Sequence, residues 1–596
     1  MGSTVLVLAL AALAAAQRHG NTVSIPTDLA TRPLYRDVYG YSIEPVWVND
    51  FLSNDMTSTL LRSITQVIGK PPPIRIGGNT ADMTSYVDRL NTTAVAIPAP
   101  NGAQRFNISR GWIEEWGRYF EQGTNLTFTL NMRDNSSEWA TARVQAEVAW
   151  GVLGSKLSRF EIGNEVDHYM AKGWRNDSWG VDAYAQQFRQ LADLIRNDAW
   201  YRDAGDKAPA FAAGSFADPP WVPDQHDQLD DMDILNLTTR AGLKNEKDGG
   251  GVHIDSFVVH MYPGSTCDAG RWRRMRLDLV SNHSSIWQNV SQYVPQVEAA
   301  ERDGRASLVM GETNSISCGG RSGISDTFGG ALWNVDYTLS LAAIGVGHSY
   351  FHLGGQNEYS SWQPKGYQYK GENITAGIRP SWYAHYFVAH VVRRSGGGGG
   401  GGDGDDDDDD SAEVPYGIAA LPGANSSDFS GFGVFEDKEL RKLVFLDMGV
   451  WNGTQGLSNP STISAADNTD AAFHSQGDRP TSEMSVSTPW CKDGEVKILR
   501  LTGPGTNAKS EVKVSGVTFD KDGKRSGQPD EETVKVGDDG EVKFNLSMAE
   551  AVLLELGDGC GGSEAGSAAA RIGAAAGGMM TWVVTVAFGV GLLVGL

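Results

Sequence analysis

Phe160-Glu161-Ile162-Gly163-Asn164-Glu165 and Leu308-Val309-Met310-Gly311-Glu312 are two short apolar runs that each end on a glutamate. A buried strand delivers such an acid at its C-terminal tip, and in a parallel barrel these tips form the mouth where catalysis takes place. Two acids delivered in this way predict an acid/base and a nucleophile, the pair that cleaves a glycosidic bond with retained configuration. Glu165 and Glu312 are therefore the predicted catalytic residues.

Outward from these runs, short apolar segments alternate with longer amphipathic ones between residues 38 and 353. Eight strands with helix-length connections predict an α/β fold, a (β/α)8 TIM barrel. The expected strands are 38–43, 74–76, 126–130, 159–162, 210–213, 256–260, 308–310 and 346–351. The expected helices include 57–68, 139–153, 182–197 and 332–344.

The chain changes character after the barrel, which we place at residues 38–394. Residues 395–411 combine a glycine run with Asp403 and the aspartates 405–410, and this composition predicts a flexible, solvated loop. Calcium binding is the alternative, although consecutive acids lack the spaced ligands of a dedicated site. Short alternating runs then predict an antiparallel β-sandwich at 412–558, which we interpret as structural because it shows no acid pair of its own.

Both ends of the chain are apolar. Residues 1–16 are typical of a secretory signal peptide cleaved before Gln17. Residues 559–596 combine small residues with the apolar stretch 579–596, which matches a GPI-anchor signal, and a retained membrane helix is the alternative. The sequence therefore predicts a secreted, extracellular protein that is attached to the cell surface and contacts the membrane through a C-terminal lipid anchor or helix.

Glycosylation and disulfide signals agree with secretion. Twelve Asn-X-Ser/Thr sequons occur, at Asn91, Asn107, Asn125, Asn135, Asn176, Asn236, Asn282, Asn289, Asn373, Asn425, Asn452 and Asn545. We expect Cys267 to pair with Cys318 and Cys491 with Cys560, because each pair lies within one predicted domain, although three connectivities are possible and free buried thiols are the alternative. The net charge of -23 argues against nucleic acid as a partner.

Further side chains fit the predicted chemistry. Asn164 is placed to bind a sugar hydroxyl beside the reacting carbon. His260 and Tyr262 share one side of the sixth strand, and the Tyr262 hydroxyl near Glu312 is expected to keep that nucleophile ionised. Glu165, desolvated and near a like charge, is expected to stay protonated.

Three other features leave alternatives open. Arg75 is either a cation near the pocket or a buried partner of the barrel's acids. His352 either touches substrate or is a core histidine. Trp362 is a candidate sugar-stacking platform, whereas Trp333 and Trp382 are expected in the core.

These residues resemble glycoside hydrolase family 79, the β-glucuronidase and heparanase-like group. The resemblance covers residues 25–558 and rests on several motifs in order: Tyr41-Ser42-Ile43-Glu44, Arg75-Ile76-Gly77-Gly78-Asn79, the segment 161–167, His260-Met261-Tyr262, Gly311-Glu312-Thr313-Asn314-Ser315, and a terminal β domain. It implies Glu165 as the acid/base and Glu312 as the nucleophile, with Asn314 among the substrate-binding residues.

The resemblance also implies that residues 17–37 contribute a strand to the β-sandwich. It implies neither a metal nor an organic cofactor, and the sequence has no His/Cys cluster at zinc spacing. Members that bind a glucuronate carboxylate have a tyrosine and glycines a few residues past the nucleophile, and another tyrosine on the eighth strand. The corresponding residues here are Ser317, Cys318, Gly319 and Phe351, so both tyrosine hydroxyls are missing. Backbone N–H groups near Gly319 and Gly320 can bind an anion in their place.

Three functions follow as hypotheses. The first is a retaining β-glucuronidase-type hydrolase that acts on a carbohydrate substrate bearing uronic acids. The second is a non-catalytic protein that binds glycans or organises the cell wall. The third is a wall transglycosylase with the same glycosyl-enzyme intermediate. The intact Asn164-Glu165 pair and Glu312 favour an enzyme.

Overall fold

The computed structural model describes residues 22–26, 28–98, 104–134, 138–217, 231–247, 250–268, 275–302, 306–369, 372–394, 416–453, 475 and 477–557. The predicted signal peptide, the Gly/Asp-rich loop, the C-terminal tail and Cys560 lie outside the described residues. The domain boundaries drawn at those segments therefore stay predictions.

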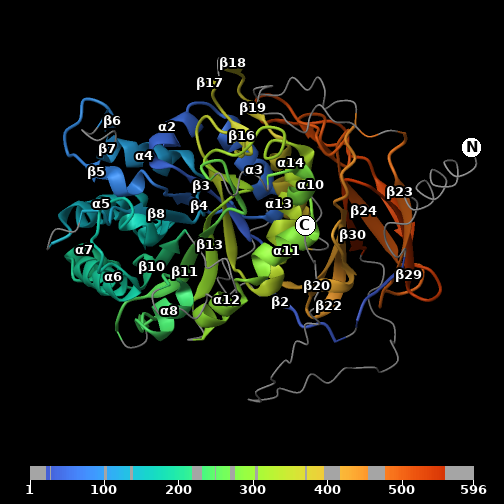
Figure 1. Cartoon of the computed structure of the whole chain (residues 1–596), viewed down its shortest axis with the longest axis horizontal. Coiled ribbons are helices and arrows are strands. Elements are labelled where there is room, and N and C mark those ends of the chain that lie inside the picture. The colour runs from blue at the N-terminus through green and yellow to red at the C-terminus, as the bar shows by residue number, and fades with distance from the viewer. Residues whose placement is uncertain are drawn as a thin grey trace, which may run out of the picture. The chain divides into compact units, whose positions relative to one another are not determined.

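Eight parallel strands close into a barrel, as the sequence predicted (Figure 1). In chain order they are β3 (Tyr39–Ile43), β4 (Ile74–Ile76), β8 (Leu126–Leu130), β9 (Leu157–Ile162), β10 (Ala210–Phe216), β11 (Ile254–Met261), β13 (Ser307–Thr313) and β15 (His348–Leu353). Each pairs with its sequence neighbour, and β15 closes the ring against β3. Strands such as β3 and β8 are buried along their whole length, which explains their continuous apolar runs.

Helices surround this barrel. They are α2 (Val48–Phe51), α3 (Met56–Ile68), α4 (Arg110–Tyr119), α5 (Ala140–Leu153), α6 (Val181–Arg196), α7 (Ala199–Ala204), α8 (Ile234–Thr239), α10 (Leu277–Val280), α11 (His283–Ser291), α12 (Val294–Glu301), α13 (Phe328–Ile344) and α14 (Pro380–Val392). The α3 helix buries Leu60, Ile64 and Ile68, spaced by one helical turn, and ends at Gly69 with a φ of 82°. The four helices expected from the sequence are confirmed as α3, α5, α6 and α13.

The terminal β domain has two sheets. One has the strand order β2 (Arg32–Leu34), β20 (Tyr416–Asn425), β21 (Phe429–Glu436), β22 (Glu439–Asp447), β30 (Glu550–Leu556), β24 (Glu495–Thr502) and β25 (Lys513–Val514), with β28 (Glu532–Lys535) also on β24. The other is β1 (Thr22–Ser24), β23 (Thr481–Ser487) and β29 (Glu541–Ser547). Thus β1 and β2, from the start of the described chain, pair with β23 and β20.

One apolar run of this domain, residues 512–519, forms two short strands instead of one. The run 512–519 contains β25 and β26 (Thr518–Phe519), separated by Ser515 and Gly516 with φ of 39° and 78°. These left-handed residues turn the chain, and β26 pairs instead with β27 (Arg525–Ser526).

Additional small sheets lie outside the barrel. They are β5 (Thr84–Tyr86) with β7 (Gln104–Ile108) and β6 (Ala94–Pro98), β12 (Gly264–Ser265) with β14 (Ile316–Ser317), β16 (Trp362–Gln363) with β19 (Gly377–Ile378), and β17 (Tyr367–Tyr369) with β18 (Glu372–Ile374). Five 3-10 turns complete the described chain: Pro45–Trp47, Ala81–Met83, Gly154–Lys156, Val166–Tyr169 and Gly205–Lys207. Among the described residues, no helix has both the length and the apolar character needed to span a bilayer.

The β domain completes the start of α13. The first two N–H groups of this helix, those of Phe328 and Gly329, donate to the carbonyls of Ala508 and Thr506 over 2.7 Å each. Lys509 beside them forms an ion pair of 3.1 Å with Asp326, and both side chains are only 1% exposed. Since a helix start leaves its first N–H groups without internal partners, the loop between β24 and β25 satisfies part of the barrel's own hydrogen bonding.

Candidate active site

A cavity of about 690 Å³ opens at the C-terminal ends of the barrel strands. This is the end at which a (β/α)8 barrel carries its chemistry. Its lining contains both predicted catalytic acids and several predicted substrate-binding residues. The lining residues are Glu44, Val46, Trp47, Asn79, Thr80, Glu165, His168, Ala217, Tyr262, Ser265, Cys267, Glu312, Ser317, Cys318, Gly319, His352, Gly354, Gly355, Gln356, Asn357 and Tyr359.

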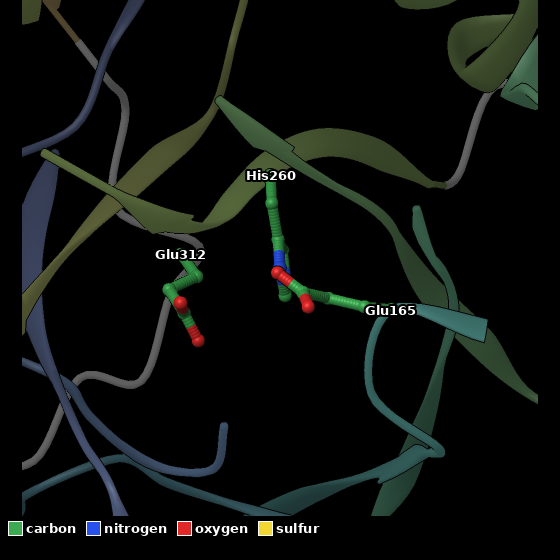
Figure 2. A group of neighbouring side chains, drawn as sticks. All are labelled: Glu165, His260 and Glu312. Carbon is green, nitrogen blue, oxygen red and sulfur yellow. The ribbon is translucent and has the colours of Figure 1, made fainter. Parts of the chain in front are cut away.

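The two glutamates meet in this cavity (Figure 2). One carboxylate oxygen of Glu165, one of Glu312 and a ring nitrogen of His260 all lie within 4.8 Å of one another. Retaining glycosidases hold their carboxyl groups about 5 to 5.5 Å apart, and inverting ones about 6.5 to 9.5 Å apart. The geometry therefore fits the retaining arrangement.

Glu312 lies on β13 with its side chain only 7% exposed. Its Oε1 accepts a hydrogen bond of 2.8 Å from the Tyr262 hydroxyl, and its Oε2 accepts one of 3.2 Å from Nη1 of Arg75. Burial opposes ionisation, but the positive charges of His352, His260 and Arg75 outweigh it and lower the pKa of Glu312. Tyr262 thus lies where the sequence predicted, although the cations contribute more than its hydroxyl to keeping the carboxyl ionised.

Glu165 follows β9 on a left-handed turn, with a φ of 49°. Its Oε1 lies 3.4 Å from Nδ1 of His260, and its Oε2 lies 3.5 Å from Nδ1 of His168 and 3.8 Å from Nζ of Lys172. Burial raises the pKa of this carboxyl, but the hydrogen bonds of both histidines and the charges of His260 and Lys172 lower it well below its usual value.

The expectation that Glu165 stays protonated is therefore wrong for this arrangement, because the sequence did not reveal the cations around it. Glu165 is a carboxylate while its histidine neighbours are charged. To act as an acid, Glu165 must take up a proton, which these hydrogen bonds and charges disfavour.

Gly163 explains how the turn before Glu165 is made. Its φ is 81°, and a Cβ at this position would lie 2.7 Å from Val166 and 2.9 Å from the Tyr169 hydroxyl. Only glycine fits both the backbone conformation and the close approach. The glycine between the strand and the acid is thus a structural requirement of the site.

Arg75 on β4 satisfies both of the alternatives considered for it. It is 1% exposed, and its guanidinium binds both carboxylate oxygens of Glu161, with Nε distances of 3.2 and 3.1 Å. The same group contacts Glu312 and donates from Nη2 to Oδ1 of Asn164 over 2.8 Å. Arg75 is therefore a buried partner of the barrel's acids and also a cation beside the predicted nucleophile.

Asn164 and His260 lie immediately behind the acids. The backbone N–H of Asn164 donates to Asp82 over 3.0 Å, while its buried Nδ2 has no hydrogen-bond partner among the described residues. Asn164 is itself fully buried and does not line the cavity, so its predicted contact with a sugar hydroxyl stays a prediction. His260 is fully buried, with Nε2 3.1 Å from Ser215 Oγ, so it orients Glu165 from below.

Asn314 is not placed as predicted. It is 2% exposed, does not line the cavity, and donates from Nδ2 to the carbonyls of His352 and Tyr359 over 3.2 and 3.3 Å. An amide that is engaged in this way supports the loop after β15, so Asn314 is a structural residue behind the site. Its position directly after the nucleophile strand gave no sign of this inward orientation.

The Cys267–Cys318 disulfide links the loops after β11 and β13, with the Cα atoms 6.0 Å apart. Both cysteines line the cavity together with Gly319, and the pairing expected from the sequence is confirmed. Cys491 is also disulfide-bonded, and its predicted partner Cys560 lies outside the described residues.

The prediction that Trp362 is a sugar-stacking platform is wrong. Trp362 is fully buried, and its Nε1 donates to Thr57 over 2.8 Å, so it belongs to the core together with Trp333 and Trp382. Trp47 is the tryptophan that lines the cavity, and Gly355 lies flat against its ring, since a Cβ there would be 2.4 Å from Cδ2.

Sequence reasoning also missed other lining residues. Glu44 directly follows β3, just as Glu312 lies at the end of β13. An acid at the end of a barrel strand could therefore have predicted Glu44 from the sequence. Tyr359 and His168 come from loops and turns whose paths only the folded chain defines. The Tyr359 hydroxyl makes no hydrogen bond to any described residue.

Glu165, His260 and Glu312 form the one group in the described part of the chain whose ligand atoms could share a metal ion. The donor set does not suit one, because the Arg75 guanidinium already contacts Glu312 and Lys172 lies near Glu165. Two fixed cations beside the same carboxylates weaken the binding of a third. Carboxylate chemistry without a metal therefore fits these residues better.

Comparison with known proteins agrees with this geometry. Residues 431–553 match the model of the glycosyl hydrolase family 79 C-terminal beta domain. A β-glucuronidase of Aspergillus niger is 25% identical over 564 residues, covering 90% of this chain and 94% of that protein. A β-glucuronidase of Neurospora crassa is 24% identical over 557 residues, covering 86% and 89%.

Solved structures share the fold. A 4-O-α-L-rhamnosyl-β-D-glucuronidase from Fusarium oxysporum 12S has a TM-score of 0.67 at 22% identity, covering 90% of this chain and 100% of that one. An α-L-arabinofuranosidase from Thermotoga maritima has a TM-score of 0.53 at 12% identity, covering 90% and 99%. Barrel and β domain thus occur together in these enzymes as they do here.

Proposed function

We propose that this chain is a member of glycoside hydrolase family 79 and a retaining β-glucuronidase that removes glucuronic acid from glycans. The observation that carries this proposal is the approach of Glu165 and Glu312 to within 4.8 Å inside one cavity. Both relatives are β-glucuronidases, which supports glucuronic acid as the sugar that is removed. The closeness of the two glutamates supports the retaining mechanism.

In the first step a carboxylate oxygen of Glu312 attacks the anomeric carbon, while the leaving oxygen takes a proton from Glu165. The bond to the leaving group breaks as the Glu312 ester forms. In the second step Glu165 takes a proton from water, whose oxygen attacks the same carbon and releases Glu312. Two inversions at one carbon give net retention.

The side chains around Glu312 support the nucleophilic role. Tyr262 and Arg75 each bind one of its oxygens, which fixes the carboxylate and keeps it charged before attack. Asn164 directly precedes Glu165, its buried Nδ2 has no hydrogen-bond partner among the described residues, and a hydroxyl of the sugar is its proposed acceptor.

Recognition of the glucuronate carboxylate requires donors that the expected tyrosine positions do not supply. Phe351 is fully buried and Ser317 lines the cavity, so neither presents a phenol. We assign the role to Tyr359, which lines the cavity together with Gly319 and whose hydroxyl makes no hydrogen bond to a described residue. A phenol and backbone N–H groups can bind a carboxylate without a cation.

Aryl β-glycosides that differ only at the sixth carbon of the sugar test this function. The expected result is hydrolysis of the glucuronide in preference to the glucoside and galactoside, with the β-anomer released first as followed by NMR. Tyr359→Phe should narrow the preference for the glucuronide over the glucoside by about 10-fold, because it removes one donor to a charged group. Preference for the glucoside or galactoside would show that the proposed glucuronide substrate is wrong. Release of the α-anomer would exclude the retaining mechanism.

We propose further that the protein is secreted and held at the cell surface. The apolar segments 1–16 and 579–596 and the sequon density support this location. Among the sequons that the structure describes, six are exposed, at Asn91, Asn125, Asn176, Asn373, Asn425 and Asn545. Asn236 and Asn452 are only 6% and 2% exposed and offer no room for a glycan. Release from intact cells by a phosphatidylinositol-specific phospholipase tests the anchor, and glycopeptide mapping should find glycans on the exposed group and none on Asn236 or Asn452.

A further inference from the structure

His352 joins two carboxylates that come from different strands. It lies on β15 with its side chain 7% exposed, and it lines the cavity. Its Nε2 is 3.5 Å from Oε2 of Glu44, and its Nδ1 is 3.6 Å from Oε2 of Glu312. Each ring nitrogen therefore faces one carboxylate.

This geometry lets the doubly protonated ring face each carboxylate with an N–H. A neutral imidazole has one N–H and one lone pair, so only one of its nitrogens can donate to a carboxylate, while a lone pair at Nδ1 can accept the proton of the Ser42 hydroxyl. The imidazolium offers an N–H to both. Ser42 Oγ, 3.1 Å from Nδ1, accepts a hydrogen bond of 2.9 Å from Arg75 and also lies within reach of the Nδ1 proton.

Neighbouring charges act on His352 from several elements. Burial disfavours the charged ring and the Arg75 cation on β4 opposes it, whereas Glu312 on β13 and Glu44 after β3 favour it. The net effect is a raised pKa of His352. The ring of Tyr359 lies 6.0 Å away and closes the remaining side.

Glu44 is itself held in one position. Its Oε1 accepts the backbone N–H of Thr80 over 2.5 Å, and its Oε2 occupies the place where a Cβ of residue 78 would lie, 1.8 Å away. Any side chain larger than that of Gly78 would therefore displace the Glu44 carboxylate. Such a fixed carboxylate in the cavity suits hydrogen bonds from sugar hydroxyls.

We propose that His352, as an imidazolium, is a positioning residue that clamps the nucleophile Glu312 and the cavity carboxylate Glu44 in one arrangement. Loss of one proton from this ring releases one of the two carboxylates. Binding of the sugar and attack on it therefore depend on the same proton. This inference rests on the proposed retaining mechanism for the role of Glu312.

A reagent that traps the nucleophile tests the effect of His352 on Glu312 without a contribution from acid catalysis by Glu165. A 2-deoxy-2-fluoro-β-D-glucuronosyl fluoride transfers its sugar to Glu312 with fluoride as the leaving group, so it needs little acid catalysis. The labelling rate, measured by mass spectrometry, should fall at alkaline pH in the wild-type protein. The variants His352→Asn and His352→Gln place a neutral donor near Nδ1 and Nε2 respectively, and both should lose the alkaline decline and label about 10- to 100-fold more slowly at pH 6.

His348→Gln is the matched control. His348 lies on the same strand, and its Nε2 is 3.3 Å from Asp37, away from the cavity. This variant should keep the wild-type decline. An alkaline decline that persists unchanged in both His352 variants would overturn the proposal. If only the fluoroglucosyl analogue labels the protein, the proposed glucuronide substrate is wrong. The same comparison of labelling rates across pH would then be made with that analogue.

Thermal unfolding tests the clamp without any substrate. Because the pKa of His352 is raised in the folded protein, its contribution to stability is complete below the unfolded pKa and is lost as the pH rises through the folded pKa. The difference in Tm between wild type and His352→Gln should be largest near pH 5 and shrink toward pH 9. A difference that is constant across this range would contradict the clamp, even for a protein that no probe labels.

Discussion

The two catalytic carboxylates share one cavity but lie in different surroundings. Glu312 ends a regular strand, is 7% exposed, and has its oxygens bound by Tyr262 and Arg75. Glu165 sits on a left-handed turn, is 13% exposed, and has three neighbours that can carry a positive charge at 3.4 to 3.8 Å. The first carboxylate is fixed by short hydrogen bonds, and the second lies among longer contacts.

This difference matches the two roles. A nucleophile needs one position and one charge state throughout, whereas an acid/base must lose and regain a proton in each cycle. Short hydrogen bonds to a buried carboxylate serve the first need. Longer contacts around a more exposed carboxylate serve the second, because they leave that carboxylate free to take up and release a proton.

The largest effect is expected for Glu312→Gln, which should lower kcat by roughly 10⁴-fold or more because an amide cannot form the glycosyl ester. Steady-state kinetics with an aryl glucuronide measure the loss. Glu301→Gln serves as the control, since Glu301 pairs with Arg32 at the surface. Near-normal turnover of the Glu312 variant would assign the nucleophile to another residue.

Glu165→Ala should lower kcat/KM by about 10²- to 10⁴-fold for substrates with poor leaving groups, because general acid catalysis is lost. The loss should be smaller for nitrophenyl glucuronides, which leave without a proton. Azide should restore turnover and give the β-glucuronosyl azide. The same treatment of Glu312→Ala should give the α-azide, and identical products from both variants would refute the assigned roles.

Tyr262→Phe should lower kcat/KM by about 10- to 100-fold, as expected for the loss of a hydrogen bond to a charged group. The hydroxyl stabilises ionised Glu312, so its removal raises the pKa of that carboxyl. Activity should therefore begin to fall at a higher pH on the acid side of the profile. A pH profile parallel to that of the wild type would show that the hydroxyl only orients the carboxylate.

Lys172→Met should give the smallest change, a few-fold in kcat/KM. Lys172 is partly exposed, 3.8 Å from Glu165, and its charge lowers the pKa of that carboxyl. Without it Glu165 holds its proton to higher pH, so the alkaline side of the profile should move upward by less than about one pH unit. Lys365→Met, which breaks the exposed contact with Asp50, is the control and should cause no shift.

The barrel could be predicted because its strands are buried on both faces and read as continuous apolar runs. The ends of individual strands were harder to predict. The run 346–351 was expected as a strand, but β15 begins at His348, after Gly347. The sheet of β5, β7 and β6 was not expected, because strands such as β6 carry exposed residues, with Val95 40% exposed. Short strands with little burial leave a weak pattern.

At the site, the strand-end residues Glu165, Tyr262 and Glu312 could be found because parallel strands bring their C-terminal ends together. Asn314 and Trp362 were misplaced because inward orientation depends on neighbours that are distant in sequence. The charge state of Glu165 could not be predicted either, since Lys172 and His168 reach it from the turn that follows β9. Position along a strand is encoded locally, whereas electrostatic surroundings are not.

The backbone bonds from Ala508 and Thr506 to the start of α13 bear on how such an enzyme can be dissected or recombined. A catalytic fragment cut before the β domain would leave the first amides of α13 without acceptors, and the buried Asp326 would lose its Lys509 counter-charge. The barrel and the β domain are separate in sequence, but we expect them to fold and unfold together. Chimaeras that exchange the β domain should keep the native 503–509 loop with the barrel it serves.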